Sequence, residues 1–153
     1  MLVPPGAPAV TRFSDGASKL RWGERFISLD YPRLPPFRIP GFLPMGRVRS
    51  GYLDHLRAQA PEAKSEVLEA PPVPDAEASL VQTTWPGDRP THVETALIMI
   101  HADHVYIVRG RSPLNKARAT RRAFDQVVES LRWVDGSDGA ARLTLTAASP
   151  GAR

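Results

Sequence analysis

The chain has 153 residues, of which 42% are hydrophobic, and a formal net charge of +4; this size and composition suit one globular domain with its own core. It contains no cysteine, which excludes disulfides, cysteine-ligated metal centres and cysteine nucleophiles. No apolar run approaches the ~18 residues that cross a membrane. The N-terminus lacks a signal-peptide pattern, so a cytoplasmic location is expected, although a mature or truncated periplasmic protein would look the same.

Composition divides the chain into three stretches. Residues 1–17 are rich in Pro, Gly and Ala and predict a mobile leader. Residues 18–134 predict a single α+β domain. Residues 135–153 are rich in Gly, Ala and Ser and predict a flexible tail, in which ARLTLTA could add an edge strand. Within the domain, the alternation in residues 25–31 predicts a first strand with one apolar face.

A proline-rich segment follows this strand. Residues 32–44 contain five prolines in thirteen positions, a density that forbids a regular helix or central strand and predicts an extended loop. Phe37, Ile39 and Phe42 are the candidate binding residues of this loop. They either pin the loop to the core or form an apolar lip that binds a partner protein, because long loops in compact domains are tied down or functional.

A short helix and two strands are expected next. Ser50 is a candidate N-cap, apolar residues follow it at helical spacing, and Pro61 ends the helix. Residues 65–70 predict a weak strand. Residues 78–85 predict another strand, which ends at a Pro-Gly turn. Trp85, beside this turn, is expected to be partly exposed and is a candidate binding aromatic.

The strongest strand signal is a hairpin around His101-Ala102-Asp103-His104. Residues 93–101 and 104–109 are rich in strand-favouring residues, and only two residues separate them. Both faces are apolar away from the tip, so the hairpin should lie centrally under at least one helix. The predicted cross-strand pairs are His101 with His104, Met99 with Tyr106, Leu97 with Val108, Ile100 with Val105 and Ile98 with Ile107.

An amphipathic helix is expected over residues 116–133, with Ser112 or Asn115 as its cap. Trp133 is expected to close the core at the end of this helix. The predicted fold is therefore α+β, an antiparallel sheet packed by this C-terminal helix and by a shorter one. The apolar stripe of the C-terminal helix has one polar member and consists of Ala117, Thr120, Phe124, Val127, Val128 and Leu131.

Little in the sequence points to catalysis. It has no GxSxG, GxxxxGK[ST] or GxGxxG motif, and its carboxylates are scattered. His101 and His104 are weak metal candidates, because two imidazoles beside a carboxylate suit zinc, but a site needs further ligands. His92 lies roughly 30 Å away along the strand at ~3.3 Å per residue. A solvated hairpin tip is favoured, and we expect no enzyme activity, metal or cofactor.

Basic residues cluster before and within the expected C-terminal helix. Cations in the first half of a helix oppose its macrodipole, which suggests an anionic partner; the alternative is an ordinary solvated helix face. Nucleic acid is one candidate partner, although exposed aromatics for base stacking and known nucleic-acid-binding signatures are lacking. Six cations fall in fourteen residues, namely Arg109, Arg111, Lys116, Arg118, Arg121 and Arg122.

Three features together resemble the PsbP/Mog-like fold family. They are a strand closing on FISLDYP (26–32), the pair VETALIMIHADHVYIVRGRSP (93–113) and a final helix ending AFDQVVESLRWV (123–134). The Ser130-Leu131-Arg132-Trp133 segment is similar to the Ser-Leu-aromatic ending of that family. The resemblance covers residues 20–134 and implies an antiparallel sheet packed by helices, as in small bacterial proteins of this group. It also implies binding, assembly or chaperone-like activity and carries over no catalytic residue.

The sequence therefore favours a non-enzymatic protein-binding domain of adaptor or chaperone-like type. The expected docking surface is the sheet face that the C-terminal helix leaves open, together with the loop over residues 37–43. The alternative is an anion-binding or nucleic-acid-binding protein that uses Arg118, Arg121 and Arg122.

Overall fold

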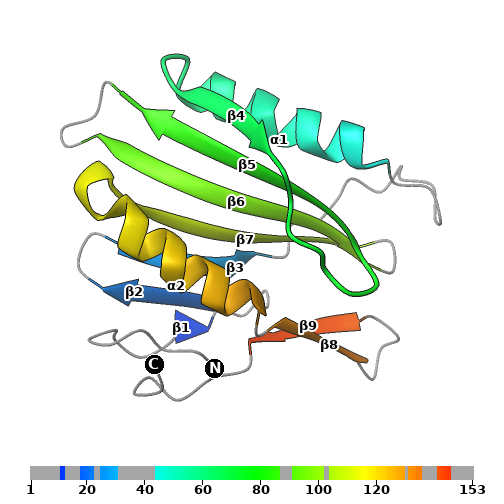
Figure 1. The fold of residues 1–153 in the computed structure, drawn as a ribbon. Helices are drawn as coiled ribbons and strands as arrows, with labels where there is room; N and C mark the ends of the chain where they lie inside the picture. The colour runs from blue at the N-terminus through cyan, green and yellow to red at the C-terminus, as the bar shows by residue number, and fades with distance from the viewer. Residues whose placement is uncertain are drawn as a thin grey trace.

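The structure, a computed structural model, describes residues 11–12, 18–22, 25–30, 44–86, 91–101, 104–129, 131–135 and 141–145. Its centre is a seven-stranded sheet of order β1-β2-β3-β7-β6-β5-β4, in which every neighbouring pair is antiparallel (Figure 1). A separate two-stranded sheet pairs β8 with β9. The elements are β1 (Thr11–Arg12), β2 (Ser18–Trp22), β3 (Arg25–Asp30), α1 (Met45–Gln59), β4 (Lys64–Leu68), β5 (Glu77–Trp85), β6 (His92–His101), β7 (His104–Pro113), α2 (Ala117–Glu129), β8 (Leu131–Asp135) and β9 (Ala141–Leu145).

The β6–β7 hairpin lies at the centre of the sheet and has the predicted register. His101 pairs with His104, and the ladder continues through Met99 with Tyr106 and Ile98 with Ile107. The two-residue connection and the apolar alternation fix this register, because a one-residue slip would move every side chain to the other face. β7 runs four residues further than expected, to Pro113, which pairs with His92, the first residue of β6.

Helix α2 packs on one face of the sheet, as predicted. Phe124 and Val127 are 1% and 0% exposed and join a cluster with Leu97 and Val108 from the central strands. Gly110 allows this close packing, since a Cβ built there would lie 3.0 Å from Cδ2 of Phe124. The α+β class with a helix packed on an antiparallel sheet is thereby confirmed.

Helix α1 packs on the opposite face, so the open face expected there is wrong over the central strands. Tyr52 and Leu53 are among the α1 residues that cover a second cluster, which contains Val81, Ile98 and Val105. α2 lies in front of the sheet and α1 behind it, which makes three layers (Figure 1).

The start of α1 differs from the prediction. The helix begins at Met45 after Pro44, whose extended backbone (φ −68°, ψ 131°) forms the N-cap, whereas Ser50 is an exposed residue inside the helix. The apolar stripe of α1 already begins at Met45, so burial overrides the serine as a start signal. With fifteen residues α1 is also longer than α2, which has thirteen, so the expectation that it would be the shorter helix is wrong.

The C-terminal helix ends four residues earlier than expected. α2 stops at Glu129, and Leu131 and Trp133 belong to β8. Leu131 is 6% exposed and Trp133 packs partly buried against the same core cluster, so their contact with the core is confirmed while their helical placement is wrong. The Leu-Arg-Trp ending that supported the family resemblance is therefore strand in this chain.

Strands β1 and β2 were not assigned from the sequence and β8 was assigned to the C-terminal helix, whereas an edge strand over ARLTLTA was an open alternative. β2 pairs with β3 and β1 with β2 at one side of the sheet, and β9 pairs with β8. β9 falls in the ARLTLTA segment of the expected tail, where it extends the small β8 sheet instead of the edge of the main one. The remainder of the expected leader and tail lies outside the described residues. Neither helix of the described part is long and apolar enough to cross a membrane.

Candidate functional site

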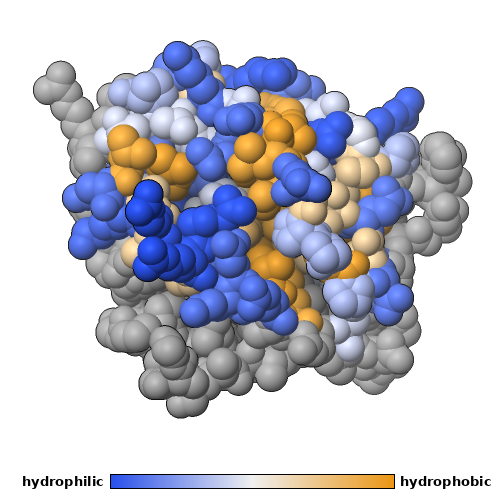
Figure 2. All heavy atoms as spheres, viewed as in Figure 1, coloured by the Kyte–Doolittle hydropathy of each residue, from blue (hydrophilic) through white to orange (hydrophobic). Residues whose placement is uncertain are grey.

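The outer face of α2 carries exposed basic residues in its first half. Arg118 and Arg122 lie four residues apart, so they occupy the same side of neighbouring turns, and both are exposed. The opposite side of α2 is the buried stripe of Thr120, Ala123, Phe124 and Val127. Because that stripe is fixed against the sheet, the two arginines must point outwards. Figure 2 shows a strongly hydrophilic patch over α2.

The chain enters α2 through a 3-10 turn, Leu114–Lys116, which adds two further exposed side chains to this surface. Leu114 is 57% exposed although it is apolar, and Lys116 is exposed beside it. The turn is held in place because the backbone N–H of Leu114 donates to the carbonyl oxygen of Thr91 at 2.8 Å. The start of α2 and the turn before it therefore present three exposed cations, Lys116, Arg118 and Arg122, and one exposed leucine.

No acidic side chain lies in the first turn of α2, so nothing on that turn offsets the cations or the positive end of the helix dipole. Further along, Nε of Arg121 donates to Oδ1 of Asp125 at 2.9 Å, an exposed pair four residues apart. Arg121, one of the three predicted binding arginines, thus has an intramolecular carboxylate partner. Arg118 and Arg122 carry the basic character of the face.

The structure separates the other two cations of the predicted cluster from this face. Arg109 and Arg111 lie on β7, and alternate residues of a strand point to opposite faces. Gly110, between them, meets Phe124 on the α2 side. Arg109 and Arg111 therefore point to the α1 side, and the six sequence-adjacent cations do not form one surface.

On the α1 side, Arg109 belongs to a network around Glu94. Glu94 is 2% exposed; its Oε1 accepts a 2.9 Å hydrogen bond from Oη of Tyr52, and its Oε2 lies 3.9 Å from Nη1 of Arg109. The guanidinium of Arg111 lies 4.3 Å from the ring centroid of Trp85. A buried carboxylate with a phenol donor and a cation is a satisfied structural arrangement.

Trp85 itself is 7% exposed. The expectation of a partly exposed binding aromatic at the end of β5 is therefore wrong. The Arg111 guanidinium covers one face of its ring in a cation–π contact. The Pro-Gly turn signal that follows Trp85 placed it correctly at a strand end but says nothing of what packs on its ring.

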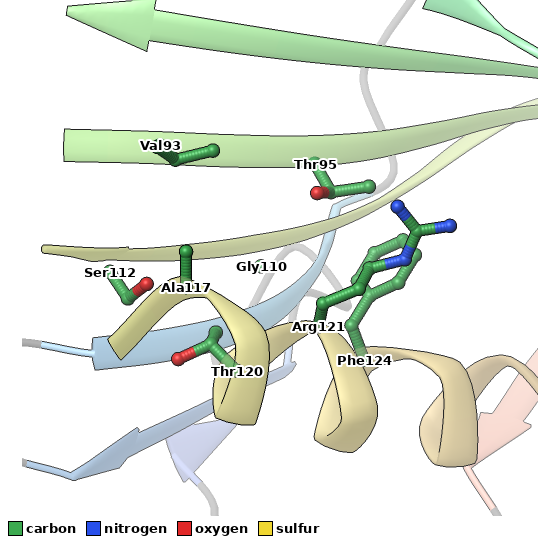
Figure 3. Close-up of a pocket in the computed structure, with 8 residues that line it drawn as sticks. All are labelled: Val93, Thr95, Gly110, Ser112, Ala117, Thr120, Arg121 and Phe124. Atoms are coloured by element: carbon green, nitrogen blue, oxygen red, sulfur yellow. The ribbon is translucent and has the colours of Figure 1, made fainter. Parts of the chain in front are cut away.

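A small cleft lies between α2 and the sheet (Figure 3). Its volume of about 10 Å³ is the room that one water molecule needs. Thr120 is 3% exposed, and its Oγ1 has no hydrogen-bond partner among the described residues. The side chains of the cleft are too close for a substrate-sized molecule. Its lining is Val93, Thr95, Gly110, Ser112, Ala117, Thr120, Arg121 and Phe124.

The histidine pair at the hairpin tip is tied into the protein through His101. The His101 ring stacks on Trp133 with centroids 3.9 Å apart and an interplanar angle of 8°, and Nδ1 lies 2.7 Å from the carbonyl oxygen of Asp75. Nε1 of Trp133 donates to the carbonyl oxygen of Pro74 at 2.6 Å. His101 and His104 are backbone partners in the ladder, and the described residues hold no group of three or more His, Asp or Glu placed to bind a metal.

The remaining candidate residues, Phe37, Ile39 and Phe42, lie outside the described residues. Sequence reasoning missed two residues that shape the sites. Leu114 follows a proline in a polar stretch and carries no periodic signal. Glu94 lies two residues before the apolar run of β6, and a lone carboxylate within a strand expected at the sheet centre was the available hint of a buried charge.

The fold and these surfaces define a three-layer α+β domain with a basic helix start on one side and a buried charge network on the other. Comparison of this chain with protein-family models, with curated proteins and with solved structures finds no match.

Proposed function

We propose that this protein is a non-catalytic binding domain that docks an acidic segment of a partner protein on the start of α2. One observation carries the proposal: Lys116, Arg118 and Arg122 are exposed in the same short segment as Leu114, which is 57% exposed. Charge complementarity gives such a surface its specificity and association rate. An exposed apolar side chain inside a charged rim supplies an anchor that a protein partner can cover.

The charge pattern along α2 favours a protein over nucleic acid. The helix has thirteen residues and is roughly 20 Å long at ~1.5 Å per residue. Asp125 and Glu129 are exposed in its second half, so a phosphate backbone lying along the helix would meet carboxylates after the first turns. A protein segment can instead match a basic first half and an acidic second half.

Nucleic acid is the second candidate, and the specific observation in its favour is the first turn of α2 without acidic residues. The cations there are not paired within that turn, which is the arrangement that counterion-releasing phosphate contacts require. In this case the affinity would come from the exposed cations Lys116, Arg118 and Arg122, without base recognition.

An adaptor or chaperone-like role of PsbP/Mog-like type is part of the proposal. The order of elements supports it, with an early strand, a central hairpin and then a packed helix. The loop with Phe37, Ile39 and Phe42 is a separate predicted contact. Its test is replacement of both phenylalanines by Asp, with partner capture as the readout and circular dichroism as the folding control.

The experiment measures fluorescence anisotropy of a labelled Glu-rich peptide with one central Leu, and of a labelled single-stranded oligonucleotide, at low and physiological salt. The double variant Arg118→Glu/Arg122→Glu should weaken peptide binding roughly tenfold or more, since two close charge pairs are inverted. The matched control is Arg47→Glu/Arg57→Glu, which makes the same change of net charge on exposed positions of α1.

Three results would contradict the proposal. Equal losses in both double variants would mean that only net charge attracts the peptide. Absence of peptide binding at low salt would remove the acidic partner. Tighter binding of the oligonucleotide, lost in the α2 variant alone, would establish the nucleic-acid alternative instead.

A further inference from the structure

Strand β4 is the edge strand of the main sheet at the end opposite β1. It pairs only with β5 among the described strands, so one row of its backbone N–H and C=O groups faces outwards. The side chains of Lys64, Ser65, Glu66 and Val67 are all exposed. Val67 is 50% exposed although it is apolar. Within the part of the chain that the structure describes, β4 is therefore unpaired along its outer edge, and four of its five side chains are exposed.

An open edge strand is a template for another strand, and proteins usually blunt such edges with charged residues. β4 carries one positive and one negative residue, Lys64 and Glu66, so a second strand of the same sequence can meet it with opposite charges as well as with like charges. Lys64 and Glu66 lie on one face of the strand, and Ser65 and Val67 on the other. A second copy of the same strand offers the same pattern in reverse when the two strands run antiparallel.

Symmetry limits how two copies can pair. Two antiparallel copies of one edge strand are related by a two-fold axis perpendicular to the sheet, so the same face of each copy points the same way. At the axis, one residue therefore lies opposite the same residue of the second copy. An axis at Lys64 or at Glu66 places like charges directly opposite each other, which is unfavourable. An axis at Val67 leaves both charged positions opposite uncharged residues.

The register with the axis at Ser65 is the one of these four that pairs the two charged residues of β4 with each other. With the axis at Ser65, Lys64 lies opposite Glu66 of the second copy, and by symmetry this pair occurs twice. Val67 then lies opposite Ala63, which covers its exposed side chain with an apolar neighbour. Opposite charges and apolar groups directly across an antiparallel ladder are the stabilising pairs of a sheet.

We propose that β4 pairs with β4 of a second copy of this chain, antiparallel and with the two-fold axis at Ser65, so that the sheet continues through both copies. α1 of both copies then lies on the same side of the joined sheet. A contact made by one short strand buries little surface and gives a weak dimer, so association depends on protein concentration.

The first experiment uses the absence of cysteine in the chain. Ser65→Cys places one thiol opposite its own symmetry copy, where directly paired Cβ atoms are ~4.5–5.5 Å apart and a disulfide needs only a small shift. Val67→Cys is the matched control on the same face, because its copy is four residues away, roughly 13 Å. Under mild oxidation, Ser65→Cys should give a cross-linked dimer and Val67→Cys should not.

The second experiment exchanges the charges. Lys64→Glu and Glu66→Lys each create two like-charge pairs and should weaken the dimer roughly tenfold or more in sedimentation across about two decades of concentration. An equimolar mixture of the two variants should restore a dimer, because the strand that carries two carboxylates then pairs with the strand that carries two ammonium groups. The double variant Lys64→Glu/Glu66→Lys should also dimerise like the unmodified chain.

The proposal is overturned if the unmodified chain stays monomeric up to the highest concentration reached. It is equally overturned if Val67→Cys cross-links as readily as Ser65→Cys, or if the mixture of the two charge variants fails to associate. All substituted side chains are exposed, so circular dichroism should show every variant folded.

Discussion

Replacing Gly110 by alanine tests the packing between α2 and the central sheet. A Cβ at this position would lie 3.0 Å from Cδ2 of Phe124 and 3.4 Å from its Cβ, whereas favourable carbon contacts need about 3.5–4.0 Å. Phe124 is 1% exposed and lies within the main core cluster, so its ring has little room to retreat. We therefore expect Gly110→Ala to strain the core.

The size of the effect follows from two opposing terms. Overpacking a well-packed core costs about 1–3 kcal/mol, while replacing glycine by alanine restricts the unfolded chain and returns about 0.4–1 kcal/mol. The net expectation is a loss of about 1–2 kcal/mol in the free energy of unfolding. For a chain of this length that corresponds to a fall in Tm of roughly 3–6 °C.

The assay is urea unfolding followed by circular dichroism, with the midpoint shifted and the slope unchanged. Gly51→Ala is the matched control, because nothing lies within 4 Å of a Cβ there and the position is an exposed helix interior. It should stabilise the protein by about 0.5–1 kcal/mol. Phe124→Leu in the Gly110→Ala background should cost less than the sum of the single changes.

A neutral or stabilising Gly110→Ala would refute this reasoning, since it would mean that Phe124 moves freely. Strict additivity with Phe124→Leu within about 0.3–0.5 kcal/mol would refute it as well, because the two residues would then not share a contact.

Two further substitutions test the charge network and the hairpin tip. Tyr52→Phe removes the 2.9 Å hydrogen bond to the buried Glu94 carboxylate and should lower the free energy of unfolding by about 1.5–3 kcal/mol in urea titration; an unchanged midpoint would show that the phenol donor is dispensable. His101→Ala removes the stack on Trp133 and the bond to the Asp75 carbonyl. It should speed amide exchange in β8 while the β6 core stays protected, and uniform protection in both strands would argue against this tie.

The β6–β7 hairpin was predictable because two local signals agree. A two-residue connection permits few turn types, and apolar alternation on both faces fixes which residues pair. The observed register, with Met99 opposite Tyr106 and Ile100 opposite Val105, depends on no long-range information. Helix α2 was predictable for the same reason, since apolar residues at helical spacing, such as Phe124 and Val127, form a stripe that must pack against an apolar surface.

The errors arose where one pattern fits two structures. Leu131 continues the stripe of α2 in sequence, but Leu131 and Trp133 equally suit alternate positions of a strand. The contact of Trp133 with His101 and with the Pro74 carbonyl cannot be read from periodicity. Ser50 carries a good capping signal, but the helix begins five residues earlier, where Met45 already packs against the core.

The candidate basic site was predicted in composition but not in extent. In sequence, Arg109 and Arg111 adjoin the cations of α2, and strand alternation places them on the other side of the sheet, toward Glu94 and Trp85. This division depends on which face α2 covers, which only the tertiary structure reveals. The exposure of Leu114 had no sequence signal.

The two groups of cations consequently contribute to different properties of the protein. Glu94 neutralises Arg109 within the structure, so that group serves packing on the α1 side. At the start of α2 no acidic residue of the first turn offsets Lys116 and Arg118, and each such cation costs the helix a few tenths of a kcal/mol. Burial of the α2 stripe against the sheet outweighs that cost. An acidic partner would offset the unfavourable interaction of these cations with the helix dipole, so part of the binding free energy would come from stabilising α2.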